Sequence, residues 1–256
     1  MAYIRKNNIR SANKAGKKGI GVAFSWPTIE GVEIIGLLGG FTHIYLDGEH
    51  GAFGPNEIDD MCRMADAHDL TVIARVPTID SWMINYYLDR GVLGIIGPHI
   101  DTPEEAKKLA DACRYTPEGH RSYGSGRGLF HGDNDLLGEE NGTRIEIMSG
   151  FNEEVLVIAQ LETKTAFDNL DDILSVPGID AYTGGPNDLA QSLGLTGQPD
   201  HPDSLAVSSE IVERVHAANK KSASDLYTDT SFHSFIRDGA KAFIKSNGGK
   251  ISPKRN

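Results

Sequence analysis

Two acidic side chains follow short apolar runs of this sequence and could together bind a divalent cation. Glu162 follows the apolar run of residues 155–161, and Asp188 follows residues 179–183 after a Gly-Gly-Pro-Asn turn. Carboxylate oxygens are the ligands that Mg²⁺ and Mn²⁺ prefer, and the other coordination positions would be left to water and substrate. Either carboxylate alone could cap a helix or pair with an arginine. Two of them at matching positions favour a metal site.

A second polar group follows another apolar run, in the motif Asp47-Gly-Glu-His50-Gly. His50 is a candidate general base, because the ordinary pKa of histidine lies near neutral pH. Asp47, three residues earlier, could orient the imidazole ring and favour its protonated form. A role for His50 in a loop turn fits the spacing equally well, and Glu49 is expected to form a salt bridge. The motif therefore predicts proton transfer by His50, with a structural role in the turn as the alternative.

Arg75 ends a third apolar run, where a guanidinium has little structural reason to be. Such a group is suited to hold a carboxylate or a developing oxyanion. A further anion site is predicted at Gly185-Pro-Asn187-Asp188, where the backbone N–H groups of Asn187 and Asp188 would open a helix. The same segment could also be only a tight strand-to-helix turn, and both interpretations can hold together.

These residues stand at the ends of runs that the pattern predicts to be β-strands bounded by Gly, Pro, Asp or Asn. The eight predicted strands are residues 19–24, 43–47, 71–76, 92–97, 155–161, 179–183, 223–227 and 241–245. Helical patterns lie between them at residues 57–68, 102–113, 166–174, 208–218 and 232–239.

This alternation predicts an α/β fold, with residues 1–256 forming one (β/α)₈ barrel whose site lies at the carboxyl ends of the strands. An open doubly wound sheet is the alternative, because the last two predicted strands are weak. Residues 1–18 are basic and predict a short helix before the first strand, although a transit peptide has a similar composition. Residues 116–149 lack a convincing strand and predict an excursion that acts as a lid or a subunit contact.

The composition excludes several classes of protein. The chain has 36 acidic and 25 basic residues, for a formal net charge of −11, which argues against a nucleic-acid partner. No apolar run reaches the ~20 residues that cross a bilayer, so no membrane partner is expected. Cys62 and Cys113 form neither a disulfide framework nor a thiolate metal cage. We expect a cytoplasmic enzyme.

Taken in order, the motifs resemble those of the HpcH/HpaI family of metal-dependent class II pyruvate aldolases. The resemblance covers about residues 19–201 and rests on the following blocks: Asp47-Gly-Glu-His50-Gly, Arg75-Val-Pro, Gly91-Val-Leu-Gly-Ile-Ile-Gly-Pro, Pro117-Glu-Gly-His-Arg121, Gln160-Leu-Glu162-Thr and Gly185-Pro-Asn-Asp188-Leu. Singly none of these blocks is specific, but together they are.

The resemblance implies a (β/α)₈ barrel, usually hexameric, that binds Mg²⁺, Mn²⁺ or Co²⁺ through Glu162 and Asp188. It also implies 2-oxoacid and aldehyde substrates: pyruvate would chelate the metal, and its carboxylate would rest on Gly185 and on the amides of Asn187 and Asp188. The remaining implied roles are enolate stabilisation by Arg75, proton transfer by Asp47 and His50, and a polar contact from Gln160.

The physical chemistry agrees with a lyase that reversibly cleaves 4-hydroxy-2-oxoacids to pyruvate and an aldehyde. This cleavage leaves the enolate of pyruvate, and a divalent cation and a guanidinium would stabilise the negative charge on its oxygen. No lysine stands at these strand ends, which disfavours a Schiff base. Oxaloacetate decarboxylation, which passes through the same enolate, and a non-catalytic carboxylate-binding barrel are the alternatives. The sequence departs from the family at His99, at residues 125–150 and after His201.

Overall fold

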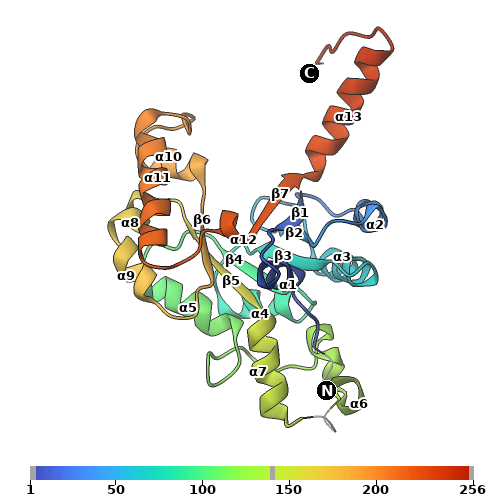
Figure 1. Cartoon of the computed structure of the whole chain (residues 1–256), viewed down its shortest axis with the longest axis vertical. Coiled ribbons are helices and arrows are strands. Elements are labelled where there is room, and N and C mark those ends of the chain that lie inside the picture. The colour runs from blue at the N-terminus through green and yellow to red at the C-terminus, as the bar shows by residue number, and fades with distance from the viewer. Residues whose placement is uncertain (1–3, 139–141, 254–256) are drawn as a thin grey trace.

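The computed structural model describes residues 4–138 and 142–253, in which seven parallel strands form one strongly curled sheet (Figure 1). The strands are β1 (Gly19–Phe24), β2 (His43–Asp47), β3 (Thr71–Arg75), β4 (Gly94–Gly97), β5 (Leu156–Leu161), β6 (Ala181–Gly184) and β7 (Tyr227–Ser231). Their order in the sheet is β6-β5-β4-β3-β2-β1-β7. The predicted α/β barrel class is confirmed, and the first six strands lie where the apolar runs predicted them.

Helices follow most of the strands and cover the outside of the sheet (Figure 1). They are α1 (Asn8–Lys14), α2 (Ile29–Leu38), α3 (Pro55–Ala67), α4 (Ser81–Leu88), α5 (Pro103–Cys113), α6 (Asn134–Leu137), α7 (Arg144–Glu154), α8 (Lys164–Asp168), α9 (Leu170–Ser175), α10 (Pro186–Ser192), α11 (Pro202–Ala217), α12 (Ala223–Leu226) and α13 (Phe232–Ser246), with a short 3₁₀ segment, η1 (Arg127–Gly132). The predicted start of α5 is confirmed, because Thr102 and Glu105 form a reciprocal capping box.

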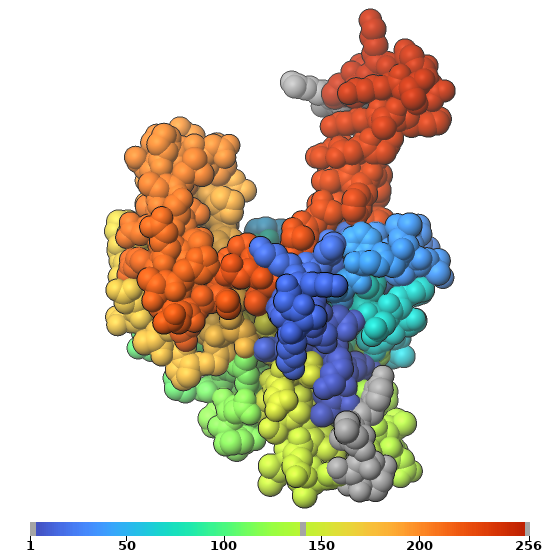
Figure 2. Space-filling model, in the orientation of Figure 1, coloured from blue at the N-terminus to red at the C-terminus, as the bar shows by residue number. Residues whose placement is uncertain are grey.

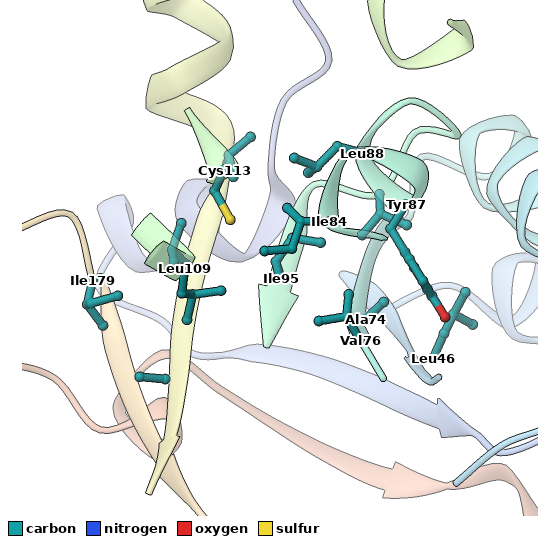
Figure 3. Close-up of a cluster of buried hydrophobic side chains, with 14 of the residues drawn as sticks. Leu46, Ala74, Val76, Ile84, Tyr87, Leu88, Ile95, Leu109, Cys113 and Ile179 are labelled. Carbon is teal, nitrogen blue, oxygen red and sulfur yellow. The ribbon is translucent and has the colours of Figure 1, made fainter. Parts of the chain in front are cut away.

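The main core lies between the sheet and its helices. In Figure 3, Leu46 and Ala74 from the strands belong to one cluster with Ile84 and Tyr87 of α4 and Cys113 of α5, and the Tyr87 side chain extends toward Leu46. A second cluster fills the inside of the barrel, where Ile9 of α1 packs against inward-facing strand residues such as Ile73, Ile158 and Ala181. β3, β4 and β5 are covered on both faces, and their sequences are accordingly almost continuously apolar.

His43 is a buried polar group in the barrel interior. Its ring lies edge-on to Tyr227, with centroids 5.0 Å apart, and Nδ1 is 2.9 Å from Thr42 Oγ1. The other ring nitrogen, Nε2, has no hydrogen-bond partner in the described part of the chain. Burial lowers the pKa of His43 to about 3, because the charged imidazolium would lose its hydration. His43 is therefore neutral in the folded protein.

We predict that His43 makes the fold sensitive to acid. The pKa of His43 is about 3 in the folded state but ~6.5 in the unfolded chain, so between these values the unfolded chain binds the extra proton. The free energy of unfolding should therefore fall as pH drops below 6.5, by up to ~1.4 kcal/mol per pH unit. Urea unfolding of His43→Phe between pH 7 and 4 should show a shallower fall than the wild type. The exposed His120, changed to Gln, is the control, and equal slopes in all three proteins would contradict this origin.

The last quarter of the chain differs from the prediction. Residues 223–226 of the predicted strand 223–227 are helical instead, because Ser222 and Asp225 form a capping box that begins α12, and only Tyr227 belongs to a strand. The chain pairs with β6 there through one isolated bridge between Tyr182 and Ser222, and then forms β7, which pairs with β1. The ring is thus open between β6 and β7.

Residues 241–245 were also predicted to be a strand, and they lie within α13. Apolar side chains at Phe235, Ile236, Phe243 and Ile244 repeat with the period of a helix, which the shorter prediction of residues 232–239 missed. None of the residues of α13 is buried. The helix projects away from the rest of the molecule (Figures 1 and 2).

The predicted excursion at residues 116–149 contains η1, α6 and the start of α7, and residues 139–141 lie outside the described part. Its residues Leu129, Leu137 and Ile147 form a small apolar cluster with the adjacent Tyr115 and Phe151. The Gly128 amide donates to the Asp89 carbonyl, just after α4, on the side where the chain enters β4. This position does not favour a lid over the carboxyl ends of the strands, and the subunit contact stays a prediction.

Candidate active site

A cavity of about 520 Å³ opens at the carboxyl ends of the strands. Of the eight predicted site residues, seven line it: Asp47, His50, Arg75, Gln160, Gly185, Asn187 and Asp188. The eighth, Glu162, lies directly after β5 and is fully buried. The structure therefore brings the predicted residues together, as expected for a barrel whose strands end at one face.

Arg75 lies between two carboxylates. Its Nε and Nη2 donate to the two oxygens of Asp47 at 3.0 and 2.9 Å, and Nη1 lies 2.9 Å from Glu49 Oε2. Burial alone would raise the pKa of Asp47, but the hydrogen bonds from Arg75 and from the His50 amide outweigh it and lower that pKa. Asp47 is thus held ionised and Arg75 is held in a fixed orientation, and the expected salt bridge of Glu49 is present.

His50 lies at the rim of the cavity and is exposed. Its backbone amide donates to Asp47 Oδ1 at 3.2 Å. Asp47 was expected to orient the His50 ring. In the structure, however, both oxygens of Asp47 accept hydrogen bonds from Arg75. The imidazole of His50 is therefore placed by its turn rather than by a bond to this carboxylate.

Glu162 has no exposed surface, and each oxygen of its carboxylate accepts a hydrogen bond. Its Oε1 accepts the backbone N–H of His99 at 3.0 Å, and its Oε2 accepts Gln160 Nε2 at 2.5 Å. Burial raises the pKa of Glu162, and the nearby negative charge of Asp188 raises it further. Gly185 lies directly against Oε2, where a Cβ atom would collide with that oxygen.

The chemistry of these donors fits a divalent cation. Glu162 and Asp188 are close enough to influence each other, and neither pairs with a lysine or arginine within residues 4–138 and 142–253. A shared cation would relieve the cost of a buried negative charge beside another one. The described residues contain no group of three or more His, Cys, Asp or Glu side chains able to hold an ion.

Several cavity residues escaped the sequence analysis. Tyr45 could have been found, because it precedes Asp47 by two residues and therefore points to the same face of β2. Tyr227 stood at the end of the predicted strand of residues 223–227, and Asp229 lay outside it, because β7 begins only at Tyr227 and continues to Ser231. Burial raises the pKa of the Asp229 carboxyl. These side chains add hydroxyl and carboxyl groups to the part of the wall formed by β2 and β7.

The chain matches known proteins over most of its length. The family model for HpcH/HpaI aldolase/citrate lyase matches residues 37–249. The chain is 35% identical to the hydroxypyruvate/pyruvate aldolase of Roseobacter denitrificans over 214 residues, covering 83% of this chain and 79% of that protein. It is 35% identical to the 4-hydroxy-2-oxovalerate aldolase of Rhodococcus jostii, covering 71% and 67% of the two chains.

Solved structures agree on the fold. An HpcH/HpaI aldolase from Desulfitobacterium hafniense superposes with a TM-score of 0.80 at 21% identity, covering 96% of this chain and 98% of that one. No helix in the described residues is both long and apolar enough to span a membrane. From the match to residues 37–249 and the identity to the two aldolases, the chain belongs to the HpcH/HpaI aldolase/citrate lyase family of carbon–carbon lyases.

Proposed function

We propose that this protein reversibly cleaves 4-hydroxy-2-oxoacids to pyruvate and an aldehyde. The observation that carries the proposal is that the cavity wall contains a guanidinium held by two carboxylates, and that Glu162 and Asp188 have no lysine or arginine partner among the described residues. The names of the similar aldolases from Roseobacter denitrificans and Rhodococcus jostii support the same substrate class. No lysine is among the described residues that line the cavity, so a Schiff base has no nucleophile there.

The residues of the cavity have separate roles in this proposal. Arg75 places its positive charge where the enolate oxygen of pyruvate develops, and Asp47 and Glu49 keep the guanidinium in position. Asn187 and Asp188 offer backbone N–H groups to the substrate carboxylate, beside Gly185. His50 moves the proton to or from the substrate hydroxyl at the cavity rim.

Glu162 and Asp188 would hold the divalent cation. A bound Mg²⁺, Mn²⁺ or Co²⁺ ion would supply Lewis-acid stabilisation of the negative charge on the substrate. Gln160 and the His99 amide keep the Glu162 carboxylate in one orientation, and the buried surroundings exclude water from it. Precise placement of the ligand carboxylates by neighbouring groups is a general requirement of such sites.

Deuterium exchange tests enolate formation directly. The protein, with Mn²⁺ and pyruvate in D₂O, should exchange the pyruvate methyl protons at a rate proportional to enzyme concentration, as followed by ¹H NMR. It should also release pyruvate from 4-hydroxy-2-oxoacids faster than from oxaloacetate. Exchange no faster than in buffer would reject the proposed function, and faster turnover of oxaloacetate would make decarboxylation the main activity.

A homo-oligomer is part of the proposal. The apolar side chains of α13, among them Phe235, Ile236 and Phe243, are exposed in the single chain. Isolated apolar surface of this kind is unfavourable in water and marks a contact site. A homo-oligomer, a hexamer by the family resemblance, would cover it.

A further inference from the structure

His99 follows β4 and Pro98 in an unusual backbone conformation. Its φ is +50°, in the left-handed region that is uncommon for any residue except glycine. This conformation directs the His99 amide to Glu162 Oε1, at a distance of 3.0 Å. Strained backbone of this kind persists where the surrounding structure enforces it, often at functional sites.

The His99 ring lies between two carboxylates. Its Nδ1 is 3.2 Å from Glu162 Oε1, and its Nε2 is 3.3 Å from Glu49 Oε1. The ring thus contacts the oxygen of Glu162 that faces away from Gly185, whereas Oε2 lies against Gly185 and accepts a bond from Gln160. Both oxygens of Glu162 therefore have a protein partner that restrains the rotation of its carboxylate.

His99 also joins two parts of the site. Arg75 contacts Glu49 through Nη1, and Glu49 contacts His99 through its other oxygen, Oε1. The contacts therefore run from Arg75 through Glu49 and His99 to Glu162. Removing the ring would interrupt this chain and leave the Glu162 carboxylate with fewer restraints, while Arg75 would keep its two bonds to Asp47.

We propose that His99 is a positioning residue that holds the Glu162 carboxylate for the divalent cation and links it to the Arg75–Glu49 pair. The inference rests on the proposed function, because it takes Glu162 as a metal ligand. The ring acts from the side of Oε1, opposite to the segment that carries Gly185 and Asp188. Groups that orient metal ligands in this way commonly change metal affinity 10–100-fold when they are removed.

Four variants separate the ring from the backbone. His99→Gly removes the ring at a backbone angle that glycine adopts freely. His99→Asn tolerates the same angle and keeps an amide at the position of Nδ1, facing Glu162. His99→Gln reaches instead toward Glu49, at the position of Nε2. Asn219→Gly is the matched control, because Asn219 has φ +56° in an exposed turn after α11.

Binding of Mn²⁺ alone, measured by isothermal titration and by electron paramagnetic resonance of free Mn²⁺, gives a readout independent of turnover. We expect His99→Gly to raise the Mn²⁺ Kd ~10–100-fold, His99→Asn to restore much of the affinity, and His99→Gln to restore little. Asn219→Gly should bind like the wild type. Saturating Mn²⁺ should return most of the kcat of His99→Gly, because Arg75 is still held by Asp47.

The possible failures are distinguishable. A wild type that binds no Mn²⁺ would reject the metal part of the proposed function. A wild type that binds Mn²⁺ while His99→Gly binds it equally well, or more tightly, would overturn the role of His99 alone. If His99→Gly does not fold, as judged by thermal unfolding in EDTA, the comparison of His99→Asn with His99→Gln decides, and equal affinities would overturn the inference.

Discussion

Replacing Arg75 with alanine is expected to lower kcat by about 10²–10³-fold, the usual effect of losing one donor to a developing oxyanion. The guanidinium is fixed by Asp47 and Glu49, so its charge is already oriented before the reaction begins. Steady-state kinetics with a 4-hydroxy-2-oxoacid, at saturating Mn²⁺, measure the effect. The KM should change much less than kcat, because the charge on the enolate oxygen is present only after bond cleavage starts.

Two further variants separate charge from geometry. Arg75→Lys keeps a positive charge but cannot donate to both oxygens of Asp47 in the same fork, so it should recover only part of the rate. Arg63→Ala removes an exposed arginine from an i,i+4 ion pair on α3 and should leave kcat unchanged. If Arg75→Ala loses thermal stability in proportion to its rate, Arg75 is a structural residue and the proposed role is wrong.

Removal of divalent cations is expected to abolish turnover. Dialysis against EDTA should reduce the activity to background, and Mn²⁺ or Co²⁺ should restore it, because the cation neutralises charge that the protein itself leaves unpaired near Glu162 and Asp188. The measurement is the aldol cleavage rate before chelation, after chelation and after each metal is added back. Activity that survives thorough chelation would exclude the metal-dependent mechanism.

Glu162→Gln should reproduce the loss of activity without a loss of folding. Burial raises the pKa of Glu162 above its unfolded value, so the folded protein binds the extra proton, and the metal-free wild type should lose stability as pH rises through that pKa. Glutamine has nearly the same shape and no charge. Thermal unfolding in EDTA should therefore show less pH-dependence in Glu162→Gln than in the wild type, with the exposed Glu213→Gln as control. A strongly destabilised Glu162→Gln would indicate a structural carboxylate.

Most of the fold could be predicted because its signals are local. The strands from β1 to β6 are apolar on both faces, so their runs stand out from the amphipathic helices between them. The position of a residue just after such a run was enough to place Asp47, Arg75 and Asp188 at one cavity, since parallel strands end at one face of a barrel.

The remaining features depend on contacts that a single sequence does not reveal. Ser222 and Asp225 cap a helix where a strand was expected. In a short polar segment, hydrogen bonds from side chains to the nearby backbone compete with the backbone hydrogen bonds of a sheet. Glu162 is buried and His99 adopts a left-handed conformation just beyond the ends of the paired strands β5 and β4. Neither is encoded in the residue type or in the spacing of the motif.

The open seam between β6 and β7 affects how the protein can move. Strands from β1 to β5 have a hydrogen-bonded strand on each side, whereas β6 has one neighbouring strand and a single bridge. The loop after β6 leads directly to Asn187 and Asp188. One open edge of the sheet therefore adjoins the segment proposed to bind the substrate. Small molecules could then enter and leave through a movement of this edge while the other strands keep their positions.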